Sequence, residues 1–127
     1  MVKAIETARK AARKALESTY EGVATVVEYK KVMNEETKLI ELGEVVVLEE
    51  QTCKLSFSKL EATKQSDSSA SVTQVTKIFI SPDITINPGS KITITQTGVT
   101  TDYTCSGVPA VYPTHQEIML ELFERWS

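Results

Sequence analysis

The spacing of apolar residues changes once along this chain, at Gly22, and that change constrains the fold more than any other feature. Before Gly22, apolar side chains recur every three or four residues, as on one face of a helix. After it, they alternate with polar side chains in short stretches that end at glycine, proline or asparagine, as in strands joined by turns. We therefore predict a mainly β fold: a small β-barrel of short antiparallel strands with an N-terminal α-helix and a long polar loop.

The predicted helix covers residues 1–20. Its apolar stripe consists of Ile5, Ala8, Ala12, Leu16 and Tyr20. Between Lys3 and Glu17 there are five basic side chains and two acidic ones, a surplus of three positive charges. This basic face could bind an acidic partner or a phosphate backbone, but a solvated face on an alanine-rich helix is the favoured interpretation.

Seven stretches after Gly22 are predicted to be strands. They are residues 23–30, 44–48, 52–58, 75–80, 84–86, 91–95 and 103–105. The unbroken apolar run within 44–48 indicates a strand covered on both faces, and residues 34–37 form a polar turn. The C-terminal stretch 116–126 fits the apolar period of a helix and also that of a strand; we favour a strand that begins after Pro113.

Two polar segments are the candidate functional regions. The first lies between residues 61 and 72, has no apolar period, and is long for a loop in a compact domain, so it is either functional or incidental. Its candidate residues are Lys64, Gln65, Ser66, Asp67, Ser68, Ser69, Ala70 and Ser71. The second consists of Asn87, Pro88, Gly89 and Ser90. Proline in its second position and glycine in its third predict a type II turn.

Length and composition indicate a single domain, residues 1–127, made of the helix at 1–20 and a β-barrel body at 22–127. No apolar run approaches the ~20 residues of a membrane span, and the first residues lack the apolar core of a signal peptide. We therefore expect a cytoplasm-like setting and no membrane partner. The net charge of -3 argues against a nucleic-acid reader, whose surface is usually basic.

Residues that usually carry catalysis or bind metals are few and scattered. His115 is the only histidine, Cys53 and Cys105 are the only cysteines, and their spacing matches no zinc site. No glycine-rich phosphate loop is present. We expect no enzymatic activity, no cofactor and no metal, with His115 at the surface or in a cap. Both cysteines are expected to be reduced and packed as small apolar residues, although adjacent strands would also allow a disulfide.

A barrel that binds nucleic acid or a small ligand is the alternative class of function. To bind nucleic acid, such a barrel would need aromatic side chains exposed on a basic face. The aromatic candidates in the predicted strands are Tyr29, Phe57, Phe79 and Tyr103. Each lies in an alternating apolar row, so packing in the core is the expected role.

Four segments, taken in order, carry a resemblance to a known family. They are residues 51–57 (QTCKLSF), 77–84 (KIFISPDI), 87–92 (NPGSKI) and 106–117 (SGVPAVYPTHQE). In this order they resemble the small minor capsid, or head-completion "stopper", proteins of long-tailed bacteriophages and prophages. The similarity runs from about Gly22 to Leu122, and its specificity comes from the ordered set rather than from any one motif.

The resemblance implies a head–tail connector in the neck of the virion, assembled in the cytoplasm of the bacterial host. Copies would form a ring below the portal and adaptor proteins, close the DNA-filled head, and receive a tail or tail-completion protein. It also implies that a loop, here 64–71 or else the turn 87–90, projects into the channel and holds the packaged DNA through non-specific contact. Within the same neck, an adaptor or tail-completion protein is the alternative.

Overall fold

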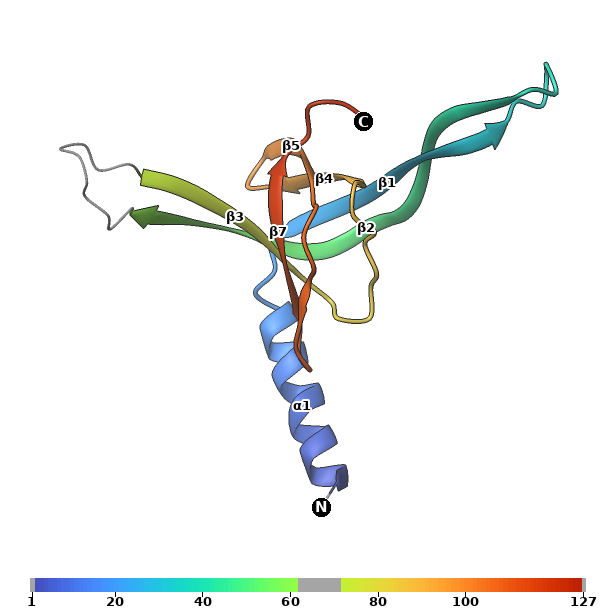
Figure 1. The fold of residues 1–127 in the computed structure, drawn as a ribbon. Helices are drawn as coiled ribbons and strands as arrows, with labels where there is room; N and C mark the ends of the chain where they lie inside the picture. Colours follow the sequence, from blue (N-terminus) through green and yellow to red (C-terminus); the bar gives the residue numbers. More distant parts are fainter. Residues whose placement is uncertain (1, 62–71, 127) are drawn as a thin grey trace.

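The computed structural model of the chain describes residues 2–61 and 72–126. Within these residues one helix precedes seven strands, and the mainly β class predicted from the sequence is confirmed (Figure 1). In chain order the elements are α1 (Val2–Glu17), β1 (Gly22–Met33), β2 (Ile40–Glu61), β3 (Val72–Ile80), β4 (Lys91–Gln96), β5 (Val99–Thr104), β6 (Ala110–Val111) and β7 (Gln116–Leu122).

The strands form a closed ring. Their order is β3-β2-β1-β4-β5-β7-β6, neighbouring strands are antiparallel, and β3 also pairs with β7. The circuit through β1, β2, β3, β7, β5 and β4 is therefore complete, and β6 lies beside β7. The ring is roughly barrel-shaped rather than a regular barrel, because β5 and β7 share only the pairs Tyr103–Leu122 and Thr104–Glu121.

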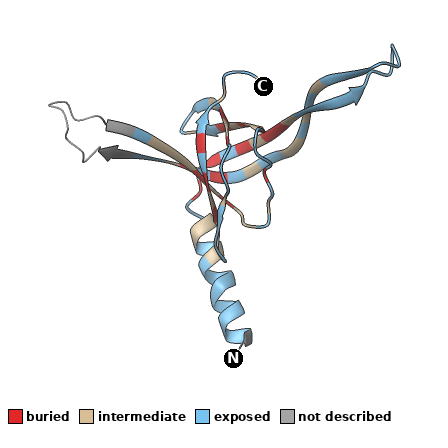
Figure 2. Cartoon of the chain, viewed as in Figure 1, coloured by how far each residue is buried: buried red, intermediate tan, exposed pale blue. Residues whose placement is uncertain are grey.

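The core fills the inside of this ring. Its fully buried apolar side chains include Val26, Cys53, Ile78, Ile80, Ile92, Ile94 and Ile118. Most are β-branched, which suits a pleated surface, and burial of each such aliphatic side chain contributes about 1.5–3 kcal/mol. Buried residues gather at the ring, while most of α1 and the outer part of the β1–β2 hairpin are exposed (Figure 2).

β2 is one strand of 22 residues where the sequence predicted two, at 44–48 and 52–58. The pairing of β2 with β1 shifts on either side of Val26, and Glu50 has a positive φ of 46°. Such β-bulges bend a strand without ending it, so β2 passes from the ring into a long hairpin (Figure 1). The predicted cover on both faces of 44–48 is wrong, because Val46 is 50% exposed.

The hairpin of β1 and β2 extends beyond the ring as an arm (Figure 1). At its tip, the Asn34 N–H donates to the Leu39 carbonyl (2.8 Å) and the Lys38 N–H donates to the Asn34 carbonyl (2.7 Å). The Asn34 side chain also accepts from the Glu36 N–H at 2.9 Å, as asparagine commonly does in turns. The polar turn predicted at 34–37 is confirmed, and the strands that it joins are longer than predicted.

Residues 81–90 contain no strand, so the strand predicted at 84–86 is wrong. The segment begins with a turn in which the Ile84 N–H donates to the Ser81 carbonyl at 3.3 Å. The buried side chain of Gln116 donates to the Ser81 and Ile84 carbonyls. These bonds take the place of strand pairing, and the alternating isoleucines still pack in or against the core.

The C-terminal stretch 116–126 begins as a strand, as favoured from the sequence. β7 pairs with β3 along Gln116–Leu120, where buried residues alternate with half-buried or exposed ones. The strand ends at Leu122, and residues 123–126 leave the ring. The helical alternative for this stretch is therefore wrong.

α1 ends at Glu17, three residues before the predicted end at Tyr20. The Arg13 guanidinium fixes the helix to the segment after β3 through an ion pair with Asp83 (2.9 Å) and a hydrogen bond to the Ser81 hydroxyl (2.6 Å). Within the helix, Arg13 also pairs with Glu17 at 3.0 Å. Tyr20 is buried, but much of the apolar stripe that precedes it is exposed. Most of the helix therefore projects from the ring (Figure 1).

Candidate functional site

The predicted turn at 87–90 has the type II features expected from its sequence. Gly89, its third residue, has a φ of 87°, and the Ser90 N–H donates to the Asn87 carbonyl at 3.2 Å. The Gly89 N–H donates to the carbonyl of Cys105 at 2.8 Å, which ties the turn to the end of β5. Because a positive φ strains most residues that have a side chain, glycine is strongly favoured at this position.

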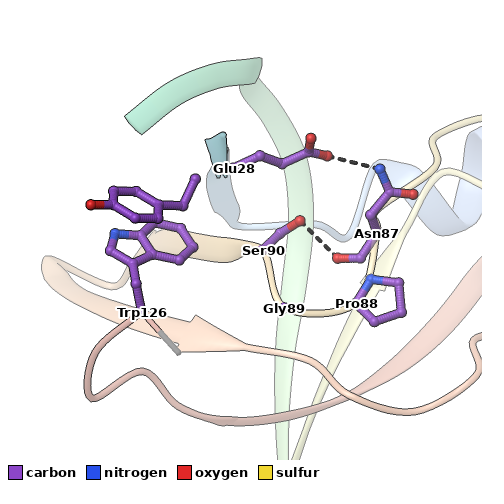
Figure 3. A pocket seen from close by; sticks show the side chains of 7 residues that line it. Glu28, Asn87, Pro88, Gly89, Ser90 and Trp126 are labelled. Carbon is purple, nitrogen blue, oxygen red and sulfur yellow. Dashed lines mark hydrogen bonds between the residues drawn. The ribbon is translucent and has the colours of Figure 1, made fainter. Parts of the chain in front are cut away.

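The turn forms one wall of a shallow cavity of about 230 Å³ at the base of the arm (Figure 3). Its lining residues are Glu28, Tyr29, Asn87, Pro88, Gly89, Ser90 and Trp126. The rings of Tyr29 and Trp126 stack with centroids 5.1 Å apart. The Asn87 amide donates to the Glu28 carboxylate at 2.9 Å. The cavity is thus a junction where the arm, the turn and the C-terminal segment meet.

Charged side chains and aromatic rings hold this junction together. The Glu44 carboxylate accepts hydrogen bonds from Lys91 Nζ (2.9 Å) and Trp126 Nε1 (3.1 Å). These bonds, chiefly that of Lys91, lower the pKa of Glu44. Hydrogen bonds from Lys30 and then Asn87 lower the pKa of Glu28. Both carboxylates therefore stay charged near neutral pH and hold the arm against the turn and the C-terminal segment.

Residues 30–43, which we call the distal arm, carry exposed apolar side chains. The large ones are Val32, Met33, Leu39, Ile40 and Leu42. Directly opposed residues of paired strands share a face, and the pairing joins Met33 to Ile40 and Lys31 to Leu42. Met33, Ile40 and Leu42 therefore lie on one face, with Ile40 66% exposed. Exposed apolar surfaces are common at protein–protein contacts, so the distal arm is a candidate interaction surface.

The sequence analysis did not identify the distal arm as a site. The sequence feature that could have identified it is the set of apolar residues on both sides of the polar turn 34–37. Apolar and polar residues alternate there in the same way as in strands that face a core, so the pattern alone does not identify an exposed surface. The difference is non-local, because β4 pairs with β1 only as far as the pair Val27–Lys91 and leaves the rest of β1 beyond the ring.

The long polar loop was the first predicted site. Its residues are Lys64, Gln65, Ser66, Asp67, Ser68, Ser69, Ala70 and Ser71. They lie outside the residues that the structure describes. Their role therefore stays a prediction.

His115 lies in a packed cluster rather than free at the surface, which corrects the prediction for it. Its Nε2 is 2.9 Å from Glu117 Oε2. Its ring stacks on Tyr112 with centroids 4.9 Å apart and meets the edge of Phe79 at 5.7 Å. The hydrogen bond with His115 is the main cause that lowers the pKa of Glu117. This cluster joins β3, β7 and the segment before β7.

The four aromatic residues considered for nucleic-acid binding do not form one exposed platform. Tyr103 is buried in the core and Phe79 packs against the histidine. Tyr29 stacks on the C-terminal indole and remains partly exposed. Phe57 is 53% exposed, so the predicted core packing is wrong for Phe57 and for Tyr29. This arrangement offers no row of stacking surfaces for successive bases.

The cysteines behave as the sequence predicted. Cys53 and Cys105 are buried and unpaired, and burial raises the pKa of Cys53 to about 12 and that of Cys105 above its ordinary value. Within residues 2–61 and 72–126, no three histidine, cysteine, aspartate or glutamate side chains are grouped so as to hold a metal ion. In that same part of the chain, no helix has the length and apolar character needed to span a membrane.

No protein-family model matches the chain, and no curated protein matches it. Among solved structures, the protein xkdH of the phage-like element PBSX from Bacillus subtilis is similar in chain path. The two sequences are 9% identical, the TM-score is 0.47, and the match covers 79% of this chain and 91% of that one.

Proposed function

We propose that this chain is a structural protein of a bacteriophage or prophage particle, a head–tail connector of the stopper or head-completion type. In this role, copies form a ring between the portal and adaptor proteins above and a tail-completion or tail protein below. The ring closes the DNA-filled head and offers the tail its attachment surface. The protein acts by binding alone, without catalysis, cofactor or metal, in the virion neck after assembly in the host cytoplasm.

One observation carries the proposal: a small ring of strands supports elements that project from it with apolar side chains exposed. The distal arm exposes Met33, Ile40 and Leu42 on one face, and α1 exposes Ile5. Exposed apolar surface costs a lone chain free energy that a subunit recovers by burying it on neighbours. The ordered similarity of residues 51–117 to stopper proteins supports a phage neck as the place of assembly.

Deletion of the encoding gene from its phage or prophage tests the proposal. We expect heads that package DNA and then lose it, together with normal free tails, and restoration of joined particles by the gene supplied in trans. If the chain were an adaptor, it would instead be needed before the step at which the head is closed. If it were a tail-completion protein, its loss would leave filled heads beside defective tails. A normal yield of infectious particles from the deletion would contradict every neck role.

The isolated protein is expected to be largely monomeric, because connector rings form on a completed head. The charged surface, with 14 basic and 17 acidic residues in the chain, should keep the monomer soluble. Light scattering on the purified chain measures this. A stable high-order ring in isolation would contradict sequential assembly and leave the connector role intact.

The loop at 64–71 is proposed to act as a steric plug in the channel. Lys64 and Asp67 cancel in charge, so closure would depend on several copies meeting at the axis rather than on phosphate binding. Shortening the loop should change stability by at most about 1 kcal/mol and should reduce the fraction of connector-bearing heads that retain DNA. If DNA retention and the melting curve were both unchanged, the loop would not close the channel, and another segment, for example the turn 87–90, would be the candidate for that role.

A further inference from the structure

We infer that residues 123–126, which we call the C-terminal latch, fix the direction in which the arm leaves the ring, and that the arm turns about its base when the latch opens. The inference goes beyond the connector role and does not depend on it. Its support lies in how far the ring holds the arm, where the arm bends, what the latch contacts, and how weakly it is held.

The ring holds only the base of the arm by strand pairing. β4 pairs with β1 as far as Val27–Lys91, and β3 pairs with β2 from Cys53–Ile80 onward. Beyond these pairs, among the residues that the structure describes, β1 and β2 pair only with each other. A two-stranded hairpin is marginally stable by itself. Contacts between its side chains and the rest of the chain therefore determine where the arm points.

The arm also bends at its base. The pairing of β1 with β2 shifts twice there, and Glu50 has a φ of 46°, which is uncommon outside glycine. In this stretch the register leaves several residues without a partner on the other strand: Thr25, Val47, Glu49 and Glu50. Bulges of this kind interrupt the ladder and bend a strand. The segments 24–26 and 47–51 thus form a hinge between the ring and the arm.

The latch contacts the arm just beyond this hinge. The indole of Trp126 stacks on the ring of Tyr29, with centroids 5.1 Å apart and planes 12° from parallel. Its Nε1 donates to the Glu44 carboxylate at 3.1 Å, and the indole lies across the cavity from Asn87 (Figure 3). Tyr29 and Glu44 are opposed in the register of the hairpin. One side chain therefore contacts both strands of the arm at the same level.

The latch is fixed to the ring at its other end. The Phe123 N–H donates to the carbonyl of Asp102 on β5 at 3.0 Å, and the Phe123 ring packs on Trp126 with centroids 4.9 Å apart and planes at 70°. Lys91 Nζ, on β4, lies 5.4 Å from the centroid of Phe123 and 5.8 Å from that of Trp126, within the range of a cation–π contact. The same ammonium group pairs with Glu44 at 2.9 Å. The latch thus links β4 and β5 to the arm.

Only side chains hold the latch to the arm. Residues 123–126 belong to no strand, Tyr29 is 41% exposed, and Glu44 is exposed as well. An aromatic pair favours the docked arrangement by about two- to tenfold, and exposed ion pairs and hydrogen bonds, such as that of Asn87 with Glu28, add little. A neighbouring molecule that binds the arm or the latch can therefore displace this contact while the ring stays paired.

A distance measurement on the purified chain tests the latch. Spin labels are attached at Glu36→Cys in the turn of the arm and at Val99→Cys on β5, both of which are exposed, while the native cysteines are buried. In double electron–electron resonance, the parent should give a narrow distribution of distances. Trp126→Ala should broaden the distribution and shift its mean. Trp126→Phe, which keeps an aromatic ring and loses the bond to Glu44, should lie between the two.

Two controls distinguish an arm that turns from an arm that unfolds. Phe57→Ala truncates an exposed aromatic ring on the part of β2 that pairs with β3, so it should leave the distribution unchanged. A second label pair, Glu36→Cys/Val46→Cys, lies on the arm beyond the hinge and should stay narrow in the Trp126→Ala background. If this pair broadened as well, the hairpin itself would be unfolding, and the latch would be refuted.

The fluorescence of Trp126 gives a second readout, since it is the only tryptophan in the chain. Glu44→Ala removes the acceptor of its Nε1 and should raise the rate constant for quenching by acrylamide. Glu41→Ala is the matched control, because Glu41 is an exposed carboxylate on the opposite face of the same strand, and it should leave quenching unchanged.

Two results would overturn the latch: an unchanged distance distribution in Trp126→Ala, or equal quenching in the two glutamate variants. Both measurements use the isolated chain, whereas the connector role is tested by deletion of the gene. A failure of either proposal therefore leaves the other standing.

Discussion

The side chain of Gln96 occupies the space that Gly22 leaves open beside it. Gln96 Oε1 accepts a hydrogen bond from the Leu55 N–H at 2.8 Å, and its Nε2 donates to the Leu55 carbonyl at 3.3 Å. A Cβ on residue 22 would lie 2.9 Å from Gln96 Oε1 and 3.1 Å from the Cys53 carbonyl oxygen. The glycine at the start of β1 therefore allows a side-chain amide to join the end of β4 to β2, the two strands that flank β1.

Gly22→Ala should destabilise the protein by about 1–3 kcal/mol, because displacing Gln96 leaves the backbone groups of Leu55 without these partners. The midpoint of urea unfolding, followed by circular dichroism, measures the loss. Gly107→Ala is the matched control, since a Cβ there meets nothing within 4 Å. Equal effects of the two substitutions would contradict this role of Gly22.

The sequence predicted this part of the fold only to a limited degree. The change of period at Gly22 located the start of β1, and the spacing of Pro88 and Gly89 predicted a type II turn, because both signals are local. The partnership of Gly22 with Gln96 joins residues 74 positions apart, and no local pattern encodes it. The same holds for the distal arm, where alternation alone does not tell a strand in the ring from one beyond it.

The β4–β5 hairpin offers a stabilising substitution. Gln96 pairs with Val99, so Thr97 and Gly98 form a two-residue loop, and their φ values are 55° and 77°. Positive φ at both positions is typical of a type I′ turn, in which asparagine followed by glycine is preferred and a β-branched residue is strained. Thr97→Asn should raise stability by about 0.5–1 kcal/mol, read as a higher melting temperature. Thr97→Val, which keeps the branch, should bring no such gain.

The two cysteines should be inert in the folded protein. Burial raises the pKa of the Cys53 thiol to about 12 and also raises that of Cys105, so neither forms the reactive thiolate near neutral pH. A thiol reagent added without reductant should find two free thiols per chain in denaturant and almost none under native conditions. Absence of free thiols in denaturant would show that a disulfide forms.

Stability should fall in acid partly through Glu117. Its pKa is lowered from the ordinary value near 4.5, first by the hydrogen bond with His115 and further by Lys77, whose Nζ lies 3.5 Å from its carboxylate. A carboxyl group whose pKa is lower in the folded state stabilises the fold at pH values above its unfolded pKa, and this contribution is lost as the pH falls through the folded pKa. The free energy of unfolding, measured from pH 6 downward, should therefore decline below about pH 4.5. At these pH values the Glu117 carboxylate of the unfolded chain takes up a proton more readily than that of the folded chain, which favours unfolding.

Glu117→Gln removes the titrating group while keeping its size. This variant should be less stable than the parent at pH 6 and should lose less stability between pH 5 and pH 3, so the two curves converge in acid. Glu121→Gln is the matched control, because Glu121 is an exposed carboxylate on the same strand, and its curve should stay parallel to that of the parent. If Glu117→Gln also ran parallel to the parent, the cluster of His115, Lys77 and Glu117 would make no charge-dependent contribution to the fold.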